Sequence, residues 1–327
     1  MIKPFQKIKS LFLVLGLAAT LAAQAQSYPS KPVRVVVGFA PGGGTDIVAR
    51  LLAQKLTESL GQPFVVENKA GATGMIGAKM VATAAPDGYT LLMGHVNSQA
   101  IAPALLDRPQ YDPIKDFAPV TYIGFVPNVL VVNSELPVKS VAELVALAKS
   151  RQKGLSFASP GVGSTNHLAG EILRAETNAG AQLVHVPYKG SGPAIVDLLG
   201  GQVDMNFDAL SSIVQYLKSG RMRALAVTAP QRDPSLPDVP TMLELGFGGF
   251  NITNWYGVVA PAGTPRAIVD KLNSEIQRII KLPDVGGKLD VLGVRREEMS
   301  PEKFGQFNLT EYSKYRDIAK RTNVRME

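Results

Sequence analysis

Residues 39–46 read FAPGGGTD, a glycine-rich turn whose residue types suit the binding of an anion. The β-branched run PVRVVVG (32–38) precedes the turn, and IVARLLAQKLTESL (47–60) follows it with the apolar spacing of a helix. A turn of this kind presents backbone N–H groups and the positive end of a helix dipole. The pattern therefore predicts an anion-binding turn.

Neither nucleotide motif fits this turn. A phosphate loop needs Gly-Lys-Ser/Thr, but Gly44 is followed by Thr45 and Asp46. The dinucleotide fingerprint needs a third glycine three residues after the second, and position 47 is Ile. A carboxylate in the first turn is typical of a helix start, and Asp46 could alternatively orient water or backbone donors near a ligand. We expect no nucleotide and no other cofactor.

A second turn repeats the first. FASPGVGSTNHLAGEIL begins at residue 157 and again has Phe-Ala, Pro-Gly, a further glycine, a hydroxyl residue and a helix. A third strand-to-helix turn reads VPYKGSGPA (186–194). Because ligands bind beyond the carboxyl ends of strands in open α/β sheets, we expect anion-binding turns that face one another across a cleft. The alternative is a chance match, because glycine turns are common in such folds.

Ser164 and His167 form the pair that would suit a hydrolase. They lie three residues apart, within reach on one helix face, and Glu171 follows one turn later, where it would orient the imidazole. No G-x-S-x-G elbow surrounds the serine. A secreted hydrolase is the alternative function, and our preferred interpretation is that Ser164 and Thr165 cap the helix.

Two acidic residues, Asp204 and Asp208, flank MNF on a predicted strand and face the same side. Asp208 stands at the carboxyl end of this strand, so we expect it, rather than Asp204, in the cleft. His95 and His185 lie near strand ends and are interpreted as structural. Trp255, the single tryptophan, is expected in the core, with the cleft as the alternative.

The first 25 residues have the pattern of a secretory signal peptide. Lysines precede the apolar run LFLVLGLAATLAA (11–23), and small residues end the leader at Ala25, the expected cleavage point. We expect export without a membrane anchor, because no other stretch approaches the ~20 apolar residues of a membrane span.

Composition excludes several classes of function. Removing the leader takes away three lysines and no acids, so the formal net charge falls from +7 to +4, and the basic residues are scattered. Nucleic-acid binding, which needs clustered Lys and Arg, is not expected. With no cysteine and three histidines, neither disulfides nor a metal site are expected.

Short β-branched runs and amphipathic helices must position these turns. The predicted strands are 32–39, 63–68, 89–94, 129–133, 155–159, 182–187, 203–208, 223–228 and 255–260. Predicted helices are 45–60, 140–150 with a capping box from Ser140 to Glu143, a helix with Thr264 as N-cap and Pro265 at its first position, and 300–323. The alternation predicts an α/β fold with mainly parallel sheets in two lobes.

Several segments together resemble the Bug proteins, the TctC family of periplasmic solute-binding components of tripartite tricarboxylate transporters. Besides the leader, they are PSKPVRVVVGFAPGGGTDIVARLLAQKL, VENKAGATGMIGAKMVATAAPDGYTLLMG, FASPGVGSTNHLAGE, VPYKGSGPA and NWYGVVAPAGTP. The resemblance covers nearly the whole chain after the leader, and its specificity lies in the order and spacing of these segments.

The resemblance implies a periplasmic binding protein fold, type II-like, with a ligand between two lobes that are each a mainly parallel sheet flanked by helices. Lobe one would comprise 26–124 plus 253–327, and lobe two 125–252. It further implies a non-enzymatic periplasmic protein, expected as a monomer, that binds a di- or tricarboxylate, an acidic amino acid or an aromatic carboxylate. The partner would be a membrane permease, or alternatively a sensor kinase. With Asp208 added from its strand position, the expected ligand-binding residues are Phe39, Pro41, Gly43, Gly44, Thr45, Asp46, Ser159, Gly163, Ser164, Thr165, His167 and Asp208.

Overall fold

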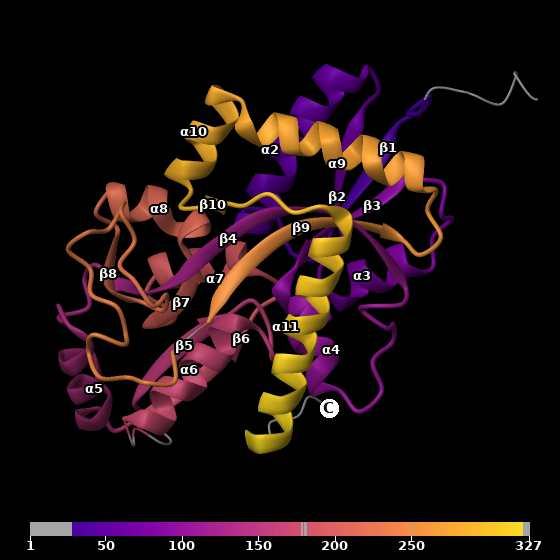
Figure 1. Ribbon diagram of the computed structural model, residues 1–327. Helices are drawn as coiled ribbons and strands as arrows, with labels where there is room; N and C mark the ends of the chain where they lie inside the picture. Colours follow the sequence, from indigo (N-terminus) through magenta and orange to yellow (C-terminus); the bar gives the residue numbers. More distant parts are fainter. Residues whose placement is uncertain (1–27, 178, 180–181, 251, 323–327) are drawn as a thin grey trace, which may run out of the picture.

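The computed structural model of the protein (Figure 1) describes residues 28–177, 179, 182–250 and 252–322. The predicted signal peptide lies outside the described residues. Within them, two groups of parallel strands are joined by two long strands, and helices pack on both groups.

Parallel strands with β1 in the middle form the sheet of the first lobe: β1 (Val33–Val37), β2 (Phe64–Asn68) and β3 (Thr90–His95). Helices follow two of them: α2 (Gly44–Leu60) after β1 and α3 (Met75–Ala82) after β2. Val35 packs in the same core cluster as Leu52 of α2, whereas Val36 packs with Ala78 of α3. Because both faces of the sheet are covered, β1 is a run of buried valines interrupted only by the exposed Arg34 near its start.

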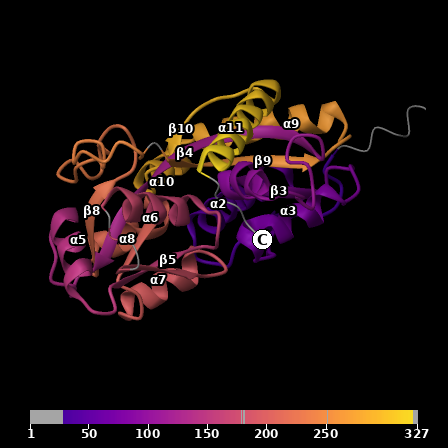
Figure 2. The ribbon, with the colours of Figure 1, turned by 90° about the horizontal axis from the view of Figure 1, so that it is seen from below.

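The second lobe repeats this plan with β5 in the middle of its parallel strands: β5 (Leu155–Ser159), β6 (Leu183–Pro187) and β7 (Met205–Ala209). Its helices are α5 (Val141–Ser150), α6 (Thr165–Glu176), α7 (Ser191–Leu199) and α8 (Leu210–Lys218). Figure 2 shows the lobes beside one another, with α5 to α8 on one side and α2 and α3 on the other.

Two long strands connect the lobes: β4 (Phe117–Asn133) and β9 (Thr253–Pro261). They pair antiparallel with each other, β9 pairs antiparallel with β3, and β4 pairs antiparallel with β7 and with β8 (Met222–Val227). The expectation of mainly parallel pairing therefore holds for the outer strands and not for these connecting strands. The sequence pattern located only 129–133 of β4, because Pro119, Gly124 and Pro127 interrupt the residues before it and the register with β9 shifts there twice.

Helix starts agree with the sequence in one case and differ in another. The Ser140 hydroxyl accepts the Glu143 N–H at 3.2 Å, as the capping box requires, although Glu143 in return accepts the N–H of Lys139. The prediction that Thr264 is an N-cap is wrong. Helix α9 (Arg266–Lys281) has Pro265 as its N-cap, and the Thr264 hydroxyl instead donates to the Pro261 carbonyl at 2.7 Å, closing the turn that follows β9.

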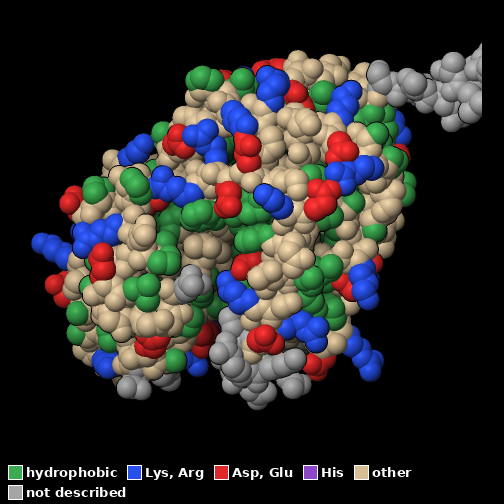
Figure 3. All heavy atoms as spheres, in the orientation of Figure 1, with side chains coloured by type: hydrophobic (Ala, Val, Ile, Leu, Met, Phe, Trp, Pro, Cys, Tyr) green, Lys and Arg blue, Asp and Glu red, His purple; other side chains and the backbone are tan. Residues whose placement is uncertain are grey.

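The remaining described elements surround the first lobe and the strand junction: η1 (Ala72–Gly74), η2 (Asn97–Ile101), α4 (Ala102–Leu105), α10 (Pro283–Val291), β10 (Arg295–Arg296) and α11 (Pro301–Thr322). Trp255 is 1% exposed and its ring contacts Tyr122, Phe304 and Phe307, which confirms its place in the core. Among the described helices, none is both long and apolar enough for a membrane span. Acidic and basic side chains are interspersed over the face drawn in Figure 3.

Candidate ligand-binding site

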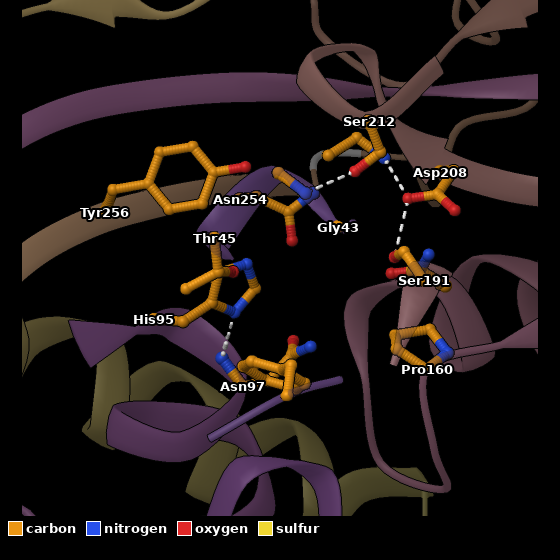
Figure 4. Close-up of a pocket in the computed structure, with 14 residues that line it drawn as sticks. Gly43, Thr45, His95, Asn97, Pro160, Ser191, Asp208, Ser212, Asn254 and Tyr256 are labelled. Carbon is orange, nitrogen blue, oxygen red and sulfur yellow. Dashed lines mark hydrogen bonds between the residues drawn. The ribbon is translucent and has the colours of Figure 1, made fainter. Parts of the chain in front are cut away.

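A pocket lies between the lobes, beyond the carboxyl ends of β1, β3 and β7. Five of the residues expected from the sequence line it: Phe39, Gly43, Gly44, Thr45 and Asp208. The other lining residues include His95, Asn97, Asn166, Ser191, Ser212 and Asn254. Figure 4 shows Thr45, His95 and Asn97 on one side of the pocket, opposite Ser191 and Asp208.

Four helices begin at this pocket, and the positive ends of their dipoles favour an anion there. Thr45 belongs to the first turn of α2, Asn166 to that of α6, Ser191 to that of α7 and Ser212 to that of α8. Each helix N-terminus carries a partial positive charge that favours an anion, although the N–H groups of Gly44 and Thr165 are already bonded to Ser212 and Asn97. No Lys or Arg is found among the described residues that line the pocket. The arrangement favours a small anion that is held by hydrogen bonds.

The first turn is shaped by its glycines and by Asp46. Gly42 has a φ of +88°, a conformation that glycine adopts readily. The Asp46 carboxylate faces back into its own turn, where it accepts the N–H of Gly42 at 3.1 Å and hydrogen bonds from Arg50 and Asn68. Burial alone would raise the pKa of Asp46, but these hydrogen bonds outweigh it and lower the pKa. Neither Asp46 nor Pro41 lines the pocket. Asp46 instead holds the backbone of the first turn through the Gly42 N–H.

The second turn contributes to the pocket mainly through residues next to the expected ones. Ser159 is hydrogen-bonded to His185 Nε2 at 2.6 Å, and Ser164 caps α6 by accepting the His167 N–H at 3.1 Å. Thr165 donates its hydroxyl to Asn254 at 2.7 Å. The hydroxyl groups of Ser159, Ser164 and Thr165 are therefore hydrogen-bonded to other protein groups, and none of the three residues lines the pocket. Pro160 and Asn166 of the same turn do line it. Thr165 was also expected to cap the helix, but its hydroxyl bonds Asn254 and Asn166 instead.

His167 holds the backbone of the second turn through a hydrogen bond to its side chain. The geometry of Ser164 and His167 does not favour a hydrolase. Its Nδ1 accepts the Gly163 N–H at 3.1 Å, and its ring stacks on His185 with centroids 4.1 Å apart. Burial, and then the neighbouring His167, lower the pKa of His185 to about 4. Because the Ser164 hydroxyl bonds the backbone of His167 and not its imidazole, the pair does not form the dyad of a nucleophilic serine. Neither His167 nor Gly163 lines the pocket.

His95 and Asn166 supply hydrogen-bond donors that sequence reasoning missed. Burial lowers the pKa of His95 to about 3, so its ring is neutral. Its Nδ1 accepts the Asn97 N–H at 3.1 Å, which leaves the proton on Nε2. The amide nitrogen of Asn166 is buried and has no hydrogen-bond partner. A buried donor without a partner is costly, so a ligand or water that accepts from Asn166 would be favoured.

Asp208 is fully buried and is the acidic side chain of the pocket. Its carboxylate accepts the Ser191 hydroxyl and the Ala209 N–H, both at 2.8 Å, and the Asn206 amide at 2.8 Å. Burial raises its pKa to about 6, although these hydrogen bonds act in the opposite direction. The sequence preference for Asp208 agrees with this position, since Asp204 binds Ser156 and Arg151 instead.

The lobes touch directly around the pocket, so the structure is a closed form. The N–H of Gly44 donates to the Ser212 hydroxyl at 2.7 Å. The Thr73 hydroxyl donates to the Val162 carbonyl at 2.5 Å, and Ala40 N–H donates to the Lys189 carbonyl at 3.0 Å. The Lys189 side chain is exposed and does not line the pocket. The first and third predicted glycine turns therefore meet directly, and the second contacts η1 of the other lobe.

Signals for the missed residues were present in part. Ser191 lies in the third glycine turn, and Asn166 follows Thr165 in the second. His95 was interpreted as structural, and nothing in the local sequence distinguishes Asn254 on β9 from an ordinary strand residue. The local sequence does not single out Asn97 either. Its amide oxygen accepts the Thr165 N–H of the other lobe at 3.0 Å, a contact that exists only in the folded chain.

Two lobes that are joined by two strands and closed over a polar pocket define a solute-binding protein. The family model described as "Tripartite tricarboxylate transporter family receptor" (TctC) matches residues 48–324, and the chain belongs to this family. The resemblance to the Bug and TctC proteins is thereby confirmed, as is the two-lobed α/β fold.

Solved structures of the same kind cover almost the whole chain. The periplasmic binding protein BugD is 38% identical, with 92% of this chain and 100% of that chain covered and a TM-score of 0.87. Rpa4515 of Rhodopseudomonas palustris, solved with adipate, is 37% identical, with 91% and 99% covered and a TM-score of 0.86. MatC of the same organism, with bound malate, is 37% identical, with 89% and 99% covered and a TM-score of 0.83.

Proposed function

We propose that this protein is exported, with its leader cleaved near Ala25, and binds a small carboxylate in the pocket between its lobes. It then delivers the ligand to the membrane permease of a tripartite tricarboxylate transporter, without chemical reaction. The lobes are taken as 26–124 plus 253–327 and 125–252. The observation that carries the proposal is the pocket itself, where four helix N-termini and the unpartnered amide nitrogen of Asn166 converge and no described lining residue is Lys or Arg.

The donors of such a pocket are sufficient for a useful affinity. Hydrogen bonds to a charged group contribute about 1.5–3 kcal/mol each, so four of them contribute about 6–12 kcal/mol before the cost of ordering. A micromolar Kd corresponds to about 8 kcal/mol. A carboxylate can therefore be held here by N–H and amide donors alone. The similar structures of MatC with bound malate and of Rpa4515 with adipate support this ligand class.

A thermal-shift screen of carboxylic acids tests the proposal. A ligand present at 100 times its Kd should add about 2.7 kcal/mol to the free energy of unfolding. We expect a rise in Tm with at least one di- or tricarboxylate, acidic amino acid or aromatic acid, and no turnover of that ligand. A rise with neutral sugars and with no carboxylate would refute the proposal.

The site itself is tested by Asn166→Ala. We expect the Kd of the carboxylate to rise about 10- to 150-fold, because one hydrogen bond to a charged group is lost. Asn308→Ala is the matched control, since Asn308 is a buried amide that donates to the Pro113 carbonyl and does not line the pocket. Equal affinity in both variants would remove Asn166 from the site.

Delivery to a permease is tested by reconstitution. Uptake of the ligand into vesicles that contain the permease should require this protein. Uptake that proceeds equally well without it would argue against delivery, and ligand-dependent stimulation of a sensor kinase would favour the alternative partner.

A further inference from the structure

Asp208 places a buried acid in a pocket that otherwise suits an anion. Its side chain has no exposed surface and lines the pocket together with helix N-termini. An anionic ligand would therefore be brought close to a second carboxylate. When two carboxylates share a site, the proton affinity of one of them rises strongly.

The groups around Asp208 offer hydrogen bonds and no positive side chain. Ser191 of α7, Asn206 of β7 and the Ala209 N–H donate to its carboxylate, and the neighbouring Ser212 hydroxyl of α8 acts on its pKa in the same direction. From β4, the residue opposite in register is Val129.

The elements on the far side of the pocket offer no cation either. Tyr256 of β9 is hydrogen-bonded to Ser211, and burial raises its pKa, so it remains a neutral phenol. At the start of α2 the pocket is lined by Gly43 and Gly44, which have no ionisable side chain, and the buried His95 of β3 is neutral. Among the described residues at this pocket, a proton is thus the available compensating charge.

We propose that the pocket takes up one proton on the Asp208 carboxyl when it binds a carboxylate ligand, so that ligand and proton are captured together. The inference rests on the proposed function and concerns the same pocket. The proton comes from solvent and adds to one carboxylate oxygen, and no covalent bond to the ligand forms.

The hydroxyl of Ser191 can accommodate this proton. It now donates to Asp208 Oδ1 at 2.8 Å. A serine hydroxyl rotates freely and has two acceptor lone pairs, so it can instead accept the new O–H of Asp208. Its own proton then points away from Asp208 and is available to the ligand, since Ser191 lines the pocket. Burial has already raised the pKa of Asp208 to about 6, so a neighbouring anion needs to raise it only moderately further.

Isothermal titration calorimetry counts the proton directly. The carboxylate that gives the largest Tm shift in the screen is titrated at pH 7.5 in two buffers of different ionisation enthalpy. The difference in the observed enthalpy gives the number of protons taken up, and we expect up to one per ligand. Between pH 6.5 and 8.5, where simple carboxylates are ionised, the Kd should rise with pH by up to about tenfold per unit.

Asp208→Asn is the decisive variant, because the amide is nearly isosteric and cannot titrate. We expect it to bind the ligand with no proton uptake and with a Kd independent of pH. Asp204→Asn is the matched control on the same chain segment, since Asp204 bonds Ser156 and Arg151 outside the pocket, and it should keep the proton uptake of the wild type.

Two results would overturn the inference: equal binding enthalpies of the wild type in both buffers, or proton uptake that persists in Asp208→Asn. The wild-type measurement decides alone if the variant does not fold. Binding of carboxylates without proton uptake leaves the proposed function intact, whereas the absence of any carboxylate binding refutes the proposed function itself.

Discussion

Gly192→Ala should block closure of the lobes without unfolding either of them. Gly192 lies in the first turn of α7, and a Cβ added to it would lie 2.1 Å from the carbonyl oxygen of Pro41 in the first turn of the other lobe. Carbon and oxygen atoms normally stay more than 3 Å apart, so the two turns must separate by about 1 Å. Helix α7 itself has room for an alanine at this position, because the overlapping atom belongs to the opposite lobe.

The magnitude follows from the contacts that this separation disturbs. The bonds from Ala40 N–H to the Lys189 carbonyl, 3.0 Å, and from Gly44 N–H to the Ser212 hydroxyl, 2.7 Å, lie beside the clash. Hydrogen bonds contribute about 0.5–1.5 kcal/mol each, so losing both destabilises the closed form by about 1–3 kcal/mol. If the ligand binds the closed form, its Kd rises about 5- to 150-fold.

The assay compares Gly192→Ala with Gly200→Ala, which changes the other end of α7. An added Cβ at Gly200 would meet its nearest neighbour, the Val196 carbonyl oxygen, at an ordinary 3.5 Å. Calorimetry gives both values of Kd, and small-angle X-ray scattering with ligand present reports the degree of closure. We expect weaker binding and a larger radius of gyration for Gly192→Ala alone. The reasoning is refuted if the two variants bind equally well, or if Gly192→Ala is as compact as the wild type.

Three further variants test other contacts. Burial raises the pKa of Asp208 to about 6, so the folded state keeps a proton that the unfolded state releases near pH 4. Between pH 4 and 7 the free energy of unfolding of the wild type should therefore fall by up to about 3 kcal/mol relative to that of Asp208→Asn. Urea denaturation measures both pH profiles, and parallel profiles would contradict this expectation. Ser164→Ala should lower the free energy of unfolding by about 1 kcal/mol, because the N-cap bond to the His167 N–H is lost. Mass spectrometry should find the ligand unaltered after incubation with the wild type or with Ser164→Ala. A product made only by the wild type would favour the hydrolase. Thr73→Val removes the bond to the Val162 carbonyl and should raise the Kd about 2- to 13-fold with little change in Tm, so an unchanged Kd would exclude this contact from the bound form.

Local patterns determined most of the elements of this protein. A short β-branched run predicts a strand wherever both faces are buried, as in β1, and an apolar stripe predicts a helix such as α2. The glycine turns were also predictable, because Gly42 and Gly163 adopt positive φ values of 88° and 75° that other residues rarely adopt. The order and spacing of several segments, these turns among them, were enough to predict the family.

The composition of the pocket was decided by tertiary structure. Asp46 and Asn166 occupy similar positions in the first turns of their helices, yet Asp46 turns back to Arg50 while Asn166 faces the pocket. The long strand β4 likewise extends well beyond the part that its sequence pattern predicts, because β9 and β7 supply its hydrogen-bond partners. A turn's backbone conformation is set by its own residues, so the sequence predicts it. The direction of a side chain, and the partners it meets, depend on segments a hundred residues away, so only the folded chain determines which of the residues at each turn face the ligand.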